Sequence, residues 1–145
     1  MTFGKISGRL FTFIALVTVI TAFAADFTES HVFNPHWPPH AKFHGAQVLV
    51  FTALLNGAAL YYIWRRDGIP RDNLNASTLL ISFFWISLGL SGIFPGAGWY
   101  DPDHVDPLLF FVMGIPGNAL SVFVFIPLIA LSSWIGFRFL KQSRP

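Results

Sequence analysis

Four long apolar segments divide this 145-residue chain and constrain its fold more than any other feature. They span about residues 10–27, 45–64, 78–97 and 110–139, and none carries Lys, Arg, Glu or His in its central part. About 20 apolar residues in a helix match the thickness of a bilayer's hydrocarbon core. Because hydrocarbon offers backbone groups no partner, each segment must satisfy its own N–H and C=O groups as a helix. We therefore predict an all-α, polytopic membrane protein, a four-transmembrane-helix bundle that forms a single membrane domain over residues 1–145.

The composition supports lipid as the solvent of this chain. Only 11% of the residues are charged and 54% are hydrophobic, whereas soluble domains carry about 25% charged residues. The absence of cysteine excludes disulfides, thiolate metal sites and cysteine nucleophiles. Phosphate-binding glycine loops, a nucleophile elbow and nucleic-acid-binding patterns are also absent. We expect the lipid bilayer, and no nucleic acid, among the partners.

The first apolar segment has a second interpretation. Lys5 and Arg9 precede a short apolar run that ends in Ala22-Phe23-Ala24, a pattern typical of cleavable signal peptides. We expect the segment to be retained as a membrane span.

The basic residues indicate an orientation. With four spans, the N-terminal segment, the second connection and the C-terminal tail lie on one face of the membrane. Eight of the nine Lys and Arg residues fall in these parts, and only Lys42 lies on the opposite face. Since positive charge marks the cytoplasmic side, we predict that both termini are cytoplasmic. The histidine-rich loop 28–44 and a second loop, 98–109, then lie on the outer, periplasmic or lumenal face.

All five histidines and five of the seven acidic residues fall on that outer face. Four of the histidines lie within residues 31–44, HVFNPHWPPHAKFH. The Pro-Pro pair predicts a helix that begins near Pro39 and runs into the second span. On this helix His40 and His44 share one face, with Gln47 one turn further on.

Two kinds of chemistry suit such a cluster. Histidines four apart on a helix can bind one metal ion, and imidazoles with carboxylates can exchange protons near neutral pH. Without thiolates, the metal would be a divalent transition metal, Zn, Fe or Cu. The candidate catalytic residues are His40, His44, His31 and Glu29, and the candidate metal ligands are His36, His40, His44, Asp101 and His104.

Each of these features has a structural alternative. Interfacial histidines often only hydrogen-bond loop carbonyls, and the Asp-x-Asp-His run at residues 101–104 could be a solvated turn. Within the spans, we expect Asn56 and Asn118 to form interhelical hydrogen bonds, with a place on a substrate cavity as the alternative. Pro116 and Pro127 predict kinks in the fourth span.

The run NPHWPPHAKFHGAQ at residues 34–47, with Asp26 and His31 upstream, resembles the loop signature of a family of small, largely uncharacterised membrane proteins of bacteria and fungi. The resemblance implies a common four-helix membrane fold. Some members are labelled acetyltransferases, a reaction for which these residues show no mechanism. The positions that match the family's motif are His31, Asn34, Trp37, Pro39, His40 and His44.

Three functions agree with these features, and we favour the first. The protein could be a membrane enzyme acting on an apolar small molecule, by metal-dependent or acid–base chemistry. It could be a non-catalytic subunit of a larger membrane complex or homo-oligomer, with structural or haem-ligating histidines. It could also bind a lipid or a metal ion. An enzyme predicts a pocket below the loop on which imidazoles and carboxylates converge.

Overall fold

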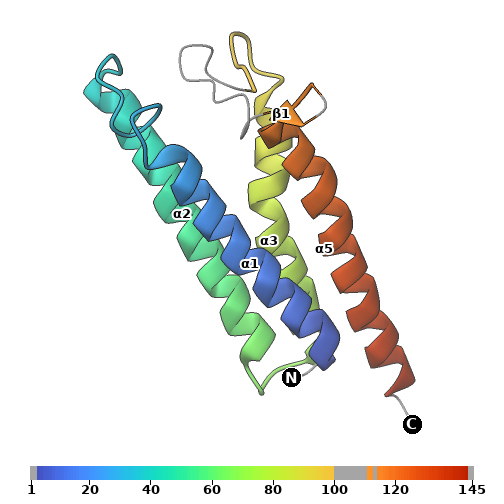
Figure 1. Ribbon diagram of the computed structural model, residues 1–145. Coiled ribbons are helices and arrows are strands. Elements are labelled where there is room, and N and C mark those ends of the chain that lie inside the picture. The colour runs from blue at the N-terminus through green and yellow to red at the C-terminus, as the bar shows by residue number, and fades with distance from the viewer. Residues whose placement is uncertain (1–2, 100–110, 113, 144–145) are drawn as a thin grey trace.

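The computed structural model describes residues 3–99, 111–112 and 114–143. In these residues four long helices lie side by side, and at the end opposite both termini α1 and α3 end and α2 and α5 begin (Figure 1). A short antiparallel pair of strands precedes the last helix and pairs Phe111 with Pro116. The elements are α1 (Lys5–Asp26), α2 (Pro39–Trp64), α3 (Pro70–Ser91), β1 (Phe111–Val112), β2 (Ile115–Pro116) and α5 (Gly117–Gln142).

All four helices are long and apolar enough to cross a membrane. Large apolar side chains remain exposed along each of them, such as Ile20, Leu54, Leu79 and Phe123. A water-soluble monomer rarely exposes so much contiguous apolar surface, whereas in a bilayer these side chains face lipid. The predicted all-α, four-helix membrane bundle is confirmed, and the chain is a multi-pass membrane protein.

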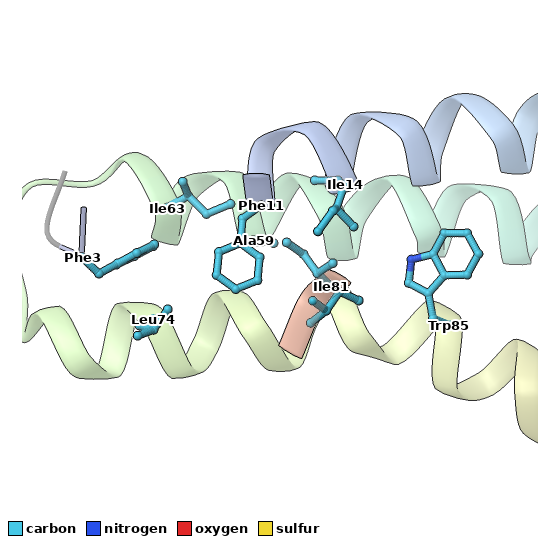
Figure 2. Packing of buried hydrophobic residues seen from close by; sticks show 10 residues of the cluster. Phe3, Phe11, Ile14, Ala59, Ile63, Leu74, Ile81 and Trp85 are labelled. Atoms are coloured by element: carbon cyan, nitrogen blue, oxygen red, sulfur yellow. The ribbon is translucent and has the colours of Figure 1, made fainter. Parts of the chain in front are cut away.

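Helix α1 contacts each of the other three long helices. Phe11 and Ile14 of α1 are fully buried, and Figure 2 shows them beside Ala59 of α2 and Ile81 of α3. Helix α1 thus contributes buried side chains to the core. The buried cluster comprises Phe3, Phe11, Ile14, Ala15, Ala59, Ile63, Leu74, Ile81, Trp85 and Ile129.

A few polar side chains link the helices inside this apolar core. Ser7 Oγ donates to the Ser132 carbonyl at 2.7 Å and joins α1 to α5. The indole N–H of Trp85 donates to Thr18 Oγ1 at 3.1 Å and joins α3 to α1. Such bonds matter in lipid because an unpaired polar group there has no water to bind.

Asn56 does not form the predicted interhelical bond. Its Nδ2 donates to the Thr52 carbonyl of the same helix at 2.9 Å. Its Oδ1 is buried and has no hydrogen-bond partner among the described residues. The prediction was wrong because a carbonyl one turn back on α2 was within reach of the amide.

The helix boundaries differ from those of the apolar segments, most of all in α3 and α5. Helix α3 begins at Pro70 rather than near residue 78, because its polar first turns are also helical, with Pro70 in the first turn. Helix α5 begins at Gly117, directly after Pro116, so Pro116 precedes the helix and cannot kink it. Pro127 does lie inside α5.

The two ends of the bundle differ in charge. Lys5, Arg9, Arg65, Arg71 and Lys141 lie near helix ends at the end of the bundle that holds both termini (Figure 1). We call this the basic end. The opposite end holds the loop between α1 and α2, with its histidines, and we call it the histidine end.

Close packing of α5 against α3 and α1 should depend on Gly136. A methyl group at Gly136 would lie 2.9 Å from both Leu74 Cδ1 and Ser7 Oγ, whereas one at Gly57 would meet nothing within 4 Å. We expect Gly136→Ala to destabilise the protein by about 1–3 kcal/mol through overpacking. Gly57→Ala should leave stability unchanged or raise it by up to about 1 kcal/mol, since alanine is the better helix former. Thermal unfolding in mild detergent measures both, and equal midpoints for the two variants would contradict this packing.

Candidate functional site at the histidine end

Helix α2 begins at Pro39, as the sequence predicts, after an extended Pro38. His40 and His44 therefore leave the helix on the same face, and their Nε2 atoms lie 3.1 Å apart. His44 Nδ1 lies 3.0 Å from Gln47 Oε1. The shared face of the two imidazoles is confirmed, and Gln47 adds a third polar group to it.

This geometry is compatible with two chemical states. In the metal-free state, His44 donates from Nδ1 to the Gln47 oxygen, so its Nε2 accepts a hydrogen bond from His40. In the other state a metal ion would take the place of the proton between the two Nε2 atoms. Two nitrogen ligands of one tetrahedral ion stand about 3.3 Å apart when each metal–nitrogen bond is about 2.0–2.1 Å. A metal-bound histidine also commonly donates its other N–H to an oxygen, as His44 would to Gln47.

The remaining predicted metal ligands do not join this pair in the described part of the chain. No group of three or more His, Cys, Asp or Glu side chains suited to a metal occurs there. His36 is exposed in the loop, and its backbone N–H donates to Asn34 Oδ1 at 2.9 Å. Asp101 and His104 lie outside the described residues. The structure thus assembles two of the five predicted ligands.

A second polar group forms where α1 ends. His31 Nε2 lies 3.7 Å from Asp26 Oδ1, an ion pair when the imidazole is protonated. His31 Nδ1 lies 2.8 Å from Ser30 Oγ, which is 2.8 Å from Thr28 Oγ1. The Trp37 ring packs edge-on against the His31 ring, with 5.5 Å between centroids. Contacts on both nitrogens and on the ring fix the direction of His31.

Asn34 braces the loop that carries His31. Its side chain is buried, accepts the backbone N–H of His36 and donates to the Ser30 carbonyl at 3.3 Å. Glu29, the other predicted catalytic residue of this loop, is exposed. It takes part in no hydrogen bond or ion pair within the described ranges.

A cavity of about 410 Å³ opens between α1, α3 and α5 at the histidine end. This volume falls within the range of small-molecule sites, about 300–1,000 Å³. Its polar lining comes from Thr21, Asp26, Asn118 and Ser121. Among the described lining residues, Asp26 is the one ionisable side chain.

We call this cavity at the histidine end the outer cavity, and contacts between side chains hold its apolar wall in place. The rings of Trp85 and Phe125 stack at 4.1 Å with an interplanar angle of 9°, and Trp85 is fixed through Thr18. Asn118 donates to the Trp99 carbonyl at 3.0 Å and lines the cavity, which is the alternative to an interhelical bond. A wall held in this way is formed before any ligand arrives.

From the sequence we predicted Glu29 as the catalytic carboxylate and noted Asp26 beside the loop signature, whereas Asp26 is the residue that lines the cavity. One signal could have found it, because Asp26 is the only charged residue within the first apolar segment. Nothing in the sequence marked Ser121 and Thr21 as lining residues of the cavity, since serines and threonines occur throughout the spans.

The chain belongs to a family of unknown function, DUF6640, whose model matches residues 10–128. The match includes the histidine-rich loop and runs into α5. No curated protein and no solved structure matches the chain. Membership agrees with the resemblance to an uncharacterised family, and it tests neither the loop motif nor an acetyltransferase activity.

The brace at Asn34 gives a direct prediction. Asn34→Ala removes two hydrogen bonds, each worth about 1 kcal/mol. Exchange of the His36 amide hydrogen should therefore accelerate by about 10-fold or more. Hydrogen–deuterium exchange measures this, with Asn75→Ala on the exposed face of α3 as the matched control. If both variants exchange like the wild type, Asn34 does not hold the loop.

Proposed function

We propose that the protein is a small membrane enzyme that binds an amphipathic small molecule in the outer cavity and exchanges a proton with it through Asp26. One observation carries the proposal: Asp26 lines a cavity of about 410 Å³, and its Oδ1 lies 3.7 Å from His31 Nε2. A carboxylate and an imidazole at one cavity are a common pair for general acid–base catalysis.

The lining suits a molecule with one polar and one apolar part. Asp26, Asn118 and Ser121 could bind the polar part, while Trp85 and Phe125 contact the apolar part. The cavity lies near the helix ends, so the polar part of a ligand would stay close to water while the apolar part enters the bundle. A preformed aromatic wall also reduces the ordering cost of binding.

His31 supports the proton transfer. After Asp26 takes a proton from the substrate as a base, His31 can carry that proton from the carboxylate toward water. The hydroxyls of Ser30 and Thr28 continue the chain of polar atoms beyond His31. The 3.7 Å between His31 Nε2 and Asp26 Oδ1 exceeds a hydrogen bond. Catalytic hydrogen bonds are often long without ligand and shorten in the complex.

His40 and His44 take another place in this proposal. They are exposed on α2 and do not line the outer cavity. The catalytic role first assigned to them and to Glu29 therefore passes to Asp26, with His31 retained.

The test compares turnover by two carboxylate variants of the loop region. Purified protein is incubated with a small-molecule extract of the host membrane, and the compounds consumed are measured by mass spectrometry. We expect the wild type to convert at least one amphipathic compound. Asp26→Asn should slow that conversion by a factor of about 10²–10⁴, the usual contribution of one acid–base group.

Glu29→Gln is the matched control, because it neutralises an exposed carboxylate three residues away. This variant should convert the same compound at the wild-type rate. Conversion that survives Asp26→Asn, or that falls equally in Glu29→Gln, would contradict the role of Asp26. No conversion of any compound by the wild type would contradict the enzyme proposal.

A second function, metal binding, is favoured by the 3.1 Å between the Nε2 atoms of His40 and His44. We propose that this pair binds a divalent transition metal, Zn, Fe or Cu, with water completing the coordination. Gln47 would hold His44 in the tautomer that presents Nε2 to the ion.

Metal content by mass spectrometry, on protein purified without a histidine tag or chelators, tests this second function. We expect about one ion per chain in the wild type and in His36→Ala, and none in His40→Ala/His44→Ala. Gln47→Leu should weaken binding by about 10-fold or more, the usual effect of removing an outer-shell partner. Metal-free wild-type protein, or equal loss in His36→Ala, would exclude this site.

A further inference from the structure

The basic end of the bundle holds a second kind of cavity. It has a volume of about 880 Å³ and lies where α1 begins, α2 ends and the last turns of α5 pass. We call it the basic cavity. Its main lining residues are Lys5, Ile6, Arg9, Trp64, Ile135 and Phe139.

Two cations face this cavity without a carboxylate. Lys5 and Arg9 are four residues apart on α1 and so share a face. The described lining contains no Asp or Glu, and neither cation forms a salt bridge in the part of the chain that the structure describes. The outer cavity has the opposite charge, since Asp26 is the one ionisable residue in its described lining.

Apart from Gly4 and Ser7, the rest of the lining is apolar, and it lies near the ends of the helices. Ile6 is 65% exposed and Phe139 is 44% exposed, so both present apolar surface outward. Trp64 is the last residue of α2, and its indole N–H donates to Thr12 Oγ1 at 3.1 Å. Tryptophan is typical of the headgroup region, where one side of the ring meets lipid and the N–H finds a polar partner.

We propose that the basic cavity binds one anionic phospholipid. Its phosphate would contact Lys5 and Arg9, and its acyl chains would lie against Ile6 and Ile135. A soluble phosphate compound would leave this apolar wall uncovered. A zwitterionic lipid would bring a cation of its own toward the two basic side chains. Basic pockets between transmembrane helices are known to bind anionic headgroups in this way.

The test is native mass spectrometry of the full chain in mild detergent, titrated with phosphatidylglycerol or with phosphatidylcholine of the same acyl chains. We expect one phosphatidylglycerol to be retained per chain, in preference to phosphatidylcholine. Lys5→Gln/Arg9→Gln should weaken retention by roughly 30-fold, since each basic residue near an anionic headgroup contributes about a factor of five.

Two further variants separate this site from a general charge effect. Arg66→Gln/Arg138→Gln removes two charges near the same end from residues that do not line the basic cavity, and it should retain the lipid like the wild type. Ile135→Trp keeps both cations and fills part of the basic cavity with a larger side chain, so it should also reduce retention of the lipid. This variant tests the site even if the charge variant does not fold.

Three results would overturn the proposal. The first is equal retention of the two lipids, and the second is an equal loss of lipid in both charge variants. The third is that glycerol phosphate displaces the bound lipid at the same concentration as added phosphatidylglycerol does. The last result would show a site for soluble phosphate compounds instead of a lipid.

Discussion

Hydrocarbon offers a peptide group no hydrogen-bond partner, and the rest of this structure follows from that constraint. It forces the four apolar segments into helices. Most serine and threonine hydroxyls in the helices then bond carbonyls of their own helix, as Thr18 does to Ile14. The few polar bonds between helices, such as Ser7 to Ser132, fix the register of neighbouring helices. The ionisable side chains are left to the two ends of the bundle, where water and headgroups can reach them.

The fold divides the histidines into two places. His31 is held beside Asp26 by the turn after α1, whereas His40 and His44 project from the first turns of α2. The histidine-rich segment is therefore not one cluster. The imidazole of His31 lies beside the carboxylate of Asp26, and the Nε2 atoms of His40 and His44 separately lie 3.1 Å apart. Acid–base chemistry and metal binding were alternatives for one site in the sequence, and in our proposals they concern different residues.

Hydropathy and proline chemistry predicted the four helices and the start of α2 at Pro39, because these depend on local sequence. The start of α3 at Pro70 was missed because the scan followed apolar residues, and polar residues can also occupy the first turns of a helix. The close approach at Gly136 was missed because it depends on Leu74 and Ser7, which are distant in sequence. The pairing of His40 with His44 follows from helical spacing. The place of Asp26 on a cavity does not, because it requires the positions of α3 and α5.

A cavity with several polar side chains in its lining opens from the histidine end into an otherwise apolar bundle. Because the chain has no cysteine, single cysteines can be introduced and labelled with a membrane-impermeant thiol reagent in sealed vesicles of either orientation. Ser121 lines the outer cavity, Leu131 lies on the lipid-facing surface of the same helix, and Ser143 lies just beyond α5 at the basic end. An opening at the histidine end predicts that Ser121→Cys is labelled only from the side opposite to Ser143→Cys. It also predicts that Leu131→Cys is not labelled from either side. An unreactive Ser121→Cys, or one labelled from the same side as Ser143→Cys, would contradict it.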